Sequence, residues 1–141
     1  MSAAGVGWEH FPHEADVGIR GFGPTREAAF EQAALALMHV VAEVDQIHPR
    51  EAIELSCAAP DDALLLVDWL NALIFEIATR SMLFARFEVR IEGARLSGKA
   101  WGEPIDPARH QPAVEVKGAT YTALEVARRD GGWLAQCVLD V

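Results

Sequence analysis

Two acidic groups gather at the end of the sequence, where an apolar strand is expected. Residues 133–141 alternate in the manner of a buried β-strand, and Asp140 and the carboxylate of Val141 follow each other at its end. Chain termini usually fray, and an unpaired charge held against apolar surface is costly. Two anions fixed side by side therefore require a cation or a positively charged partner. The alternative is that Asp140 simply reaches solvent at the rim of a sheet.

Asp16 is a second candidate ligand. Aspartate is depleted in strands, yet Asp16 opens an expected strand shortly after His13. Together with Asp140 and the terminal carboxylate, these two residues could form a site for a hard divalent ion such as Mg²⁺, Ca²⁺ or Mn²⁺. Simpler roles are also open, namely a turn-capping Asp16 and a hydrogen-bonded or exposed His13. The spacing alone does not bring the residues together.

Other chemically suggestive patterns are weaker. His10 and His13 lack the cysteines or helical frame of a zinc site, and the glycines at 21 and 23 lack the third glycine of a dinucleotide loop. No serine lies in a nucleophile elbow. Lys117 lies between two strand-like segments, where it contacts either a carboxylate cluster, a partner, or only the apolar surface under its own stem.

Apolar periodicity predicts two helices and several strands that must position these residues. Thr25 offers an N-cap ahead of apolar residues at helical spacing, whereas the second helix is apolar nearly all round and should be the most buried element. The expected elements are, in chain order, extended segments at 8–11 and 17–22, a helix from Thr25 to Val41, a strand at 52–58, a helix at 64–78, a hairpin of 87–91 with 96–100, and strands at 114–117, at 120–127 and from 133 onward. A Pro- and His-containing loop is expected at 102–112. This pattern predicts an α+β fold, with a mostly antiparallel or mixed sheet and two main helices packed on one face.

Size and charge narrow the classes of function. At 141 residues and 51% apolar content, the chain is expected to form a single domain over residues 1–141. The 21 acidic residues outnumber the 12 basic ones, for a net charge of −9, so direct binding of RNA or DNA is not expected. A basic protein partner or a metal cation suits this charge, although ordinary solubility explains it as well.

The chain carries no sign of export or membrane insertion. Cys57 and Cys137 lie in apolar alternating segments without a paired spacing, which is typical of buried, reduced cysteines. The first residues show no signal peptide, and no apolar segment is long enough to span a membrane. We therefore expect a cytoplasmic protein without a membrane partner.

Five segments together resemble the archease family in order and spacing. The resemblance spans nearly the whole chain and rests on residues 13–19 (His-Glu-Ala-Asp-Val-Gly-Ile), 67–71 (Val-Asp-Trp-Leu-Asn), 102–106 (Gly-Glu-Pro-Ile-Asp), 114–121 (Val-Glu-Val-Lys-Gly-Ala-Thr-Tyr) and 139–141 (Leu-Asp-Val). The sequence departs from the family pattern at Glu14, where threonine is usual, and at Gly118, where alanine is usual.

The resemblance implies a non-enzymatic accessory protein. Archeases assist the GTP-dependent tRNA-splicing RNA ligase by promoting guanylylation of its active-site histidine and by supporting multiple turnover. Their metal site, carried over to this sequence, comprises Asp16, Asp140 and Val141, and calcium, manganese or magnesium would be the ion. Glu115 and Lys117 are expected near the contact with the ligase, with His13 as a further candidate. Two other functions stay open from the residues, a metal-dependent phosphoester hydrolase and a chaperone-like protein-binding module.

Overall fold

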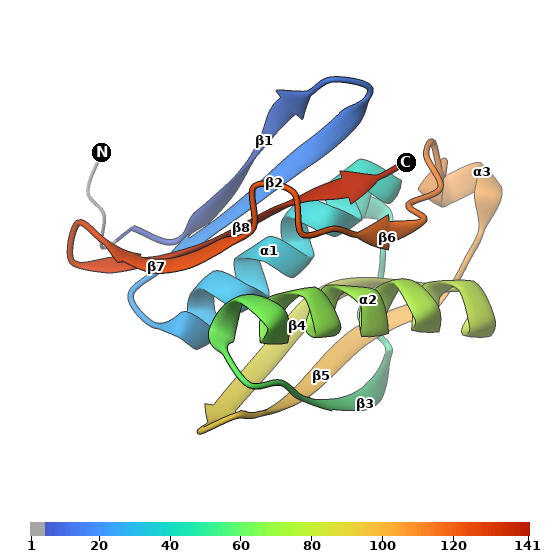
Figure 1. Ribbon diagram of the computed structural model, residues 1–141. Coiled ribbons are helices and arrows are strands. Elements are labelled where there is room, and N and C mark those ends of the chain that lie inside the picture. The colour runs from blue at the N-terminus through green and yellow to red at the C-terminus, as the bar shows by residue number, and fades with distance from the viewer. Residues whose placement is uncertain (1–4) are drawn as a thin grey trace.

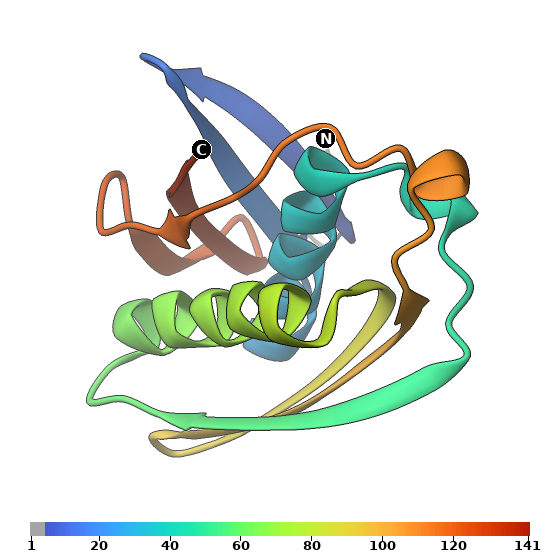
Figure 2. The same cartoon turned by 90° about the vertical axis from the view of Figure 1, so that its right-hand side faces the viewer.

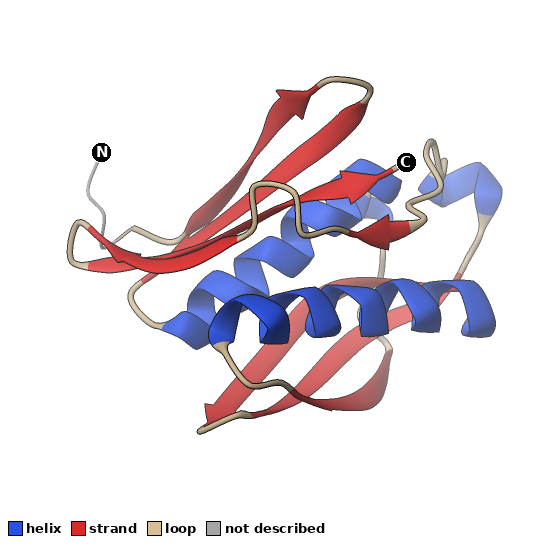
Figure 3. Ribbon diagram, in the orientation of Figure 1, coloured by secondary structure: helices blue, strands red, loops and turns tan. Residues whose placement is uncertain are grey.

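The computed structural model describes residues 5–141, which form eight strands, three α-helices and one 3₁₀ turn (Figures 1 and 3). In chain order the elements are β1 (Gly7–His13), β2 (Asp16–Gly23), α1 (Arg26–Val41), η1 (Val44–Gln46), β3 (Glu51–Ala58), α2 (Asp62–Arg80), β4 (Met82–Glu92), β5 (Arg95–Pro104), α3 (Pro107–His110), β6 (Gly118–Ala119), β7 (Glu125–Arg129) and β8 (Gly132–Asp140).

The strands divide between two antiparallel sheets. The first has the order β1-β2-β8-β6, with β7 also paired to β8, and the second has the order β3-β5-β4. Figures 1 and 2 show α1 and α2 between the two sheets, and both helices contact strands of each sheet. The core therefore lies in this central layer, where Phe30, Leu37, Leu66, Leu70 and Leu73 are fully buried.

Both long helices begin at capping side chains. Thr25 Oγ1 accepts a hydrogen bond of 3.0 Å from the Ala28 N–H, and Asp61 Oδ1 accepts one of 2.9 Å from the Leu64 N–H. Each cap satisfies one of the backbone donors that a helix leaves unpaired in its first turn. The caps fix where α1 and α2 start, and so which faces they turn to the sheets.

The predicted α+β class and its antiparallel strands are confirmed, and so are the two long helices and their order. The prediction that the second helix is the most buried element was wrong, because α1 buries eight of its 16 residues and α2 only six of its 19. Each sheet packs helices against one of its faces, as expected, but the strands form two sheets that share one helical layer. Apolar periodicity distinguishes buried from exposed faces, but it does not say which strands are hydrogen-bonded to one another. The partition into two sheets is therefore visible only in the structure.

Three segment predictions in the second half were wrong. Residues 114–117 form no strand and residues 120–124 lie outside β7, whereas the expected loop at 102–112 contains the end of β5 and the helix α3. Within 113–117 only Val116 is buried. The alternation of apolar and polar residues in this segment therefore reflects one buried side chain and not a strand. The backbone of this segment bonds to the end of α1 and to β8, where Ala113 donates to Val41 and Lys117 donates to Asp140.

Candidate functional site

The start of β2 and the end of β8 meet at one edge of the first sheet. The strands are antiparallel, and Val17 lies opposite Leu139 in their register. The next residues outward are Asp16 on β2 and Asp140 on β8, which therefore lie at the same end of the sheet. Asp16 Oδ1 also accepts a hydrogen bond of 3.3 Å from the Val141 N–H. The fold thus brings together the three residues Asp16, Asp140 and Val141, which we call the carboxylate end.

A third segment closes the other side of the carboxylate end. Gly118 of β6 lies opposite Asp140 in register, and the Lys117 N–H donates a hydrogen bond of 2.7 Å to the Asp140 carbonyl. β8 is therefore held at its end between β2 and the segment that carries Lys117. Lys117 contacts the carboxylate end through its main chain, and its side chain is exposed.

The oxygen atoms of this site suit a hard cation. Carboxylate and main-chain oxygens are the donors that Ca²⁺, Mg²⁺ and Mn²⁺ prefer. Within residues 5–141, neither Asp16 nor Asp140 forms an ion pair that would neutralise it. The same residues contain no cluster of three or more His, Cys, Asp and Glu side chains arranged to hold a metal. An ion here would thus be bound by two side-chain carboxylates, with main-chain or water oxygens completing its shell.

The additional predicted residues lie at different distances from this end. His13 lies opposite Asp16 across the β1–β2 turn and is half-buried. Glu14 within that turn has a φ of 56°, in the left-handed region that favours glycine. Glu115 is exposed and, with Lys117, lines an apolar cleft between the C-terminal half of α2 and residues 114–117. No hydrogen bond joins Glu115 to either aspartate in the described part of the chain.

A buried carboxylate that the sequence analysis did not single out lies elsewhere, at the end of β5. Glu103 is 3% exposed, and its Oε2 accepts hydrogen bonds from Arg109 Nη1 (2.6 Å), the His48 N–H (2.8 Å) and His110 Nε2 (2.8 Å). The fully buried His110 accepts at Nδ1 from the Asp106 N–H, which leaves its proton on Nε2.

These bonds make Glu103 a structural residue. The Arg109 guanidinium holds the pKa of the Glu103 carboxyl well below its usual range, with support from the His48 N–H and His110. Because one oxygen is already bound by three donors, the carboxylate is poorly suited to act as a base. The network fixes α3 and the segment that follows η1 to β5. Glu103 belongs to one of the five segments of the resemblance, but no spacing indicates that residues 48, 109 and 110 converge on it.

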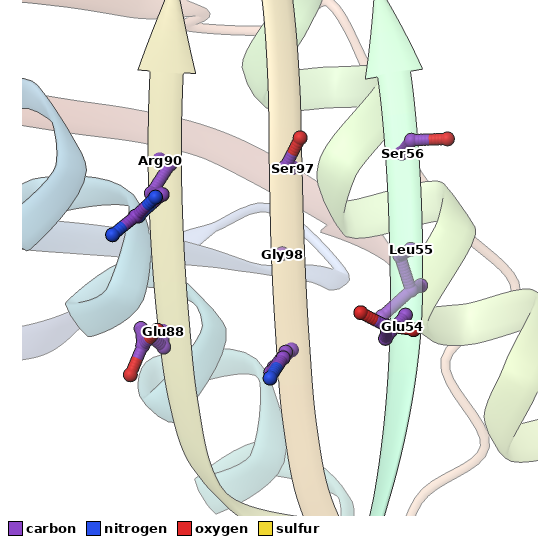
Figure 4. Close-up of a pocket in the computed structure, with 8 residues that line it drawn as sticks. Glu54, Leu55, Ser56, Glu88, Arg90, Ser97 and Gly98 are labelled. Atoms are coloured by element: carbon purple, nitrogen blue, oxygen red, sulfur yellow. The ribbon is translucent and has the colours of Figure 1, made fainter.

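The outward face of the second sheet carries a hollow of about 580 Å³, remote in the topology from the carboxylate end. Figure 4 shows Glu54 and Ser56 on β3, Ser97 on β5, and Glu88 and Arg90 on β4. Lys99 lies opposite both Glu54 and Glu88 in register, so opposite charges face each other across the strands. This arrangement is typical of a solvated sheet face.

Comparison with known proteins identifies similar chains over nearly the whole length. The model of the Archease protein family (MTH1598/TM1083) matches residues 8–141. The protein archease of Pyrococcus furiosus is 41% identical over 139 residues, covering 95% of this chain and 98% of that protein. The protein archease of Pyrococcus abyssi is 40% identical over 139 residues with the same coverage of both chains.

Two solved structures share the fold. The solution structure of Methanobacterium thermoautotrophicum protein 1598 has a TM-score of 0.85 at 34% identity and covers 96% of this chain and 99% of its own. A crystal structure from Thermotoga maritima, described as an archease and possible chaperone, has a TM-score of 0.60 at 18% identity, with 94% and 96% coverage, and supports the fold alone. Among the described residues, the helices are all too short or too polar to cross a membrane.

Proposed function

The chain belongs to the archease family, and we propose that it is a metal-binding accessory protein that activates a GTP-dependent tRNA-splicing RNA ligase. In this role it promotes guanylylation of the ligase and multiple turnover, and it joins no RNA itself. The observation that supports the proposal is the hydrogen bond from the Val141 N–H to Asp16 Oδ1. It joins two acidic segments from opposite ends of the sequence at one edge of the sheet.

Asp16 and Asp140 would hold the ion, with a main-chain oxygen of Val141 as a further donor. A divalent ion bound there would neutralise charge on the phosphate oxygens of the ligase-bound nucleotide. Lys117 fixes the Asp140 carbonyl through its N–H, and its exposed side chain, like that of Glu115, is available to the ligase. The net charge of −9 favours a basic surface on the partner and disfavours direct contact with RNA. Such a partnership would take place in the cytoplasm.

The test is ligase guanylylation with purified components. The ligase is incubated with GTP and Mn²⁺, with and without this protein, and formation of the ligase–GMP adduct is followed. We expect the wild-type protein to accelerate adduct formation and Asp16→Asn to lose the acceleration. Asparagine keeps the shape and an acceptor oxygen for the Val141 N–H, so the variant removes charge with little disturbance of the fold.

Asp130→Asn is the matched control. Asp130 is an exposed carboxylate in the turn before β8, at the opposite end of that strand from Asp140. The control variant should accelerate the ligase as the wild type does. Equal acceleration by Asp16→Asn, or no acceleration by the wild-type protein, would contradict the proposal.

A further inference from the structure

β6 is a very short strand at the edge of its sheet. It has two residues, Gly118 and Ala119, and only these pair with β8. Figures 1 and 2 show β6 between β8 and α2, so one edge of β6 faces the helix. A strand edge leaves backbone donors and acceptors unpaired, which is costly where water is excluded. Another group must therefore satisfy this edge.

The side chain of Asn71 on α2 fills that role. Its Oδ1 accepts a hydrogen bond of 2.8 Å from the Ala119 N–H, and its Nδ2 donates one of 3.4 Å to the Ala119 carbonyl. The side-chain amide thus pairs with both the N–H and the C=O of Ala119, as a residue of a neighbouring strand would. Asn71 is half-buried, and a Cβ added to Gly118 would lie 3.5 Å from its Oδ1, so β6 packs directly against the amide.

We infer that Asn71 is a positioning residue for the proposed metal site, an inference that rests on the proposed function. The Asn71 side chain binds the main chain of Ala119, two residues after Lys117. The Lys117 N–H in turn donates to the Asp140 carbonyl. On the opposite side of β8, Asp16 binds the Val141 N–H. The end of β8 is therefore fixed from both sides, and Asn71 ties one of them to the most apolar helix of the core.

Thr120 ties the end of β6 to β8, on the side away from α2. Its N–H and its Oγ1 both donate to the Val138 carbonyl, at 3.0 and 2.8 Å, so the residue that follows β6 is bound to β8. Without Asn71, β6 would keep its bonds to β8 and lose its two hydrogen bonds to α2. The end of β8 would still pair with β2 and bind Asp16, but it would lose its tie to the helical layer, and the backbone at Asp140 would have more room to move. Carboxylates that are to share one ion tolerate little such movement.

The experiment compares Mn²⁺ binding in the wild type, Asn71→Leu and Asn71→Asp by isothermal titration calorimetry. Asn71→Leu removes both hydrogen bonds with a side chain of similar size and good helix propensity, and we expect Mn²⁺ affinity to fall about 10-fold. Asn71→Asp keeps the acceptor for the Ala119 N–H and should recover most of the affinity. Thr79→Val is the matched control, because it removes a side-chain hydrogen bond on the same helix, to Phe75, away from β6.

Amide hydrogen exchange of Lys117 and Ala119 supplies the second measurement. Both amides should exchange faster in Asn71→Leu and as in the wild type in Thr79→Val. Protection of Ala119 in Asn71→Asp would show that the recovered affinity comes from the hydrogen bond and not from the added charge alone. A purely structural role for Asn71 predicts a lower melting temperature with unchanged Mn²⁺ affinity.

The failures can be told apart. Mn²⁺ binding that is lost in Asp16→Asn but kept at full strength in Asn71→Leu overturns the inference and leaves the proposed function standing. A wild-type protein that binds no Mn²⁺ overturns both. Loss of affinity in Thr79→Val equal to that in Asn71→Leu also overturns the inference, because any weakening of α2 would then suffice.

Discussion

Glu103 is a buried carboxylate whose charge the fold must keep. Its pKa lies below the usual glutamate value of 4.5 in the folded protein, chiefly because Arg109 donates to it. The unfolded chain therefore takes up the proton first as the pH falls. The network contributes its full stability above about pH 4.5 and loses it progressively as the pH falls toward the lowered pKa.

Glu103→Gln should lower the free energy of unfolding by about 2 kcal/mol at pH 7. The neutral amide removes the negative charge to which Arg109 and His110 donate, so these donors are left poorly paired. The difference from the wild type should shrink below pH 4.5, the usual glutamate value. Urea unfolding at several pH values measures it. Glu54→Gln on the outward face of β3 is the control and should change stability little at any pH. A constant difference across the whole range would contradict the assigned charge state.

Residue type alone indicated part of the site. Asp16 is identifiable because aspartate is unusual in strand-forming sequence, and Asp140 and the carboxylate of Val141 because they follow an apolar strand; the resemblance implies the same three residues. Asn71 stands out as a polar residue in a largely apolar helix, and Glu103 lies in a segment of the resemblance, but neither pattern indicates which groups they bind. Their roles depend on Ala119 and on Arg109 and His110, which only the folded chain brings near them. Hydrogen-bond partners across different elements are set by tertiary packing, which single-sequence patterns do not encode.

At the scale of elements, α1 lies directly on the backbone of β2. A Cβ built on Gly21 would come within 2.2 Å of the Ala29 carbonyl oxygen and 2.4 Å of the Ala33 nitrogen. These are helix backbone atoms, which cannot rotate away as a side chain can. The glycine therefore sets the distance between α1 and the strand that begins with Asp16.

Gly21→Ala should lower the free energy of unfolding by about 3 kcal/mol, because helix and strand must separate to admit the methyl group. Gly7→Ala on the neighbouring strand is the matched control, since nothing lies within 4 Å of its added Cβ. The control should change stability by less than about 0.5 kcal/mol. Urea denaturation of both variants tests the packing. Equal stability of the two would show that α1 is free to move away from the sheet.

Helices were easier to predict than the later strands for a physical reason. The apolar spacing that begins after Thr25 repeats over several turns, so it identifies α1. The cap at Thr25 marks where the helix begins. β6 has two residues and exists because β8 and Asn71 lie on either side of it. No local pattern can predict a strand whose pairing is supplied wholly by distant segments.

At the scale of the whole molecule, two sheets enclose one helical layer, and the carboxylate end lies at the rim of the first sheet. The sequence predicted the class, the helices and the antiparallel pairing, but not the division of the strands between two sheets. One sheet and two sheets would bury the same apolar strand faces, so the apolar pattern does not distinguish them. The rim location has a thermodynamic consequence. Asp16 and Asp140 meet only when β2 and β8 are paired, so an ion that binds both binds the folded chain and not the unfolded one.

Mn²⁺ should therefore raise the melting temperature. At a free concentration 100 times the dissociation constant, binding to the folded state alone adds about 2.7 kcal/mol, which corresponds to roughly 8 °C for a domain of this size. Asp140→Asn should abolish the shift, whereas Asp130→Asn should keep it. A chaperone-like module without a metal role predicts no shift in any variant. A phosphoester hydrolase predicts the shift together with turnover of a phosphoester by the protein alone, so the same titration followed by a hydrolysis assay separates the three functions.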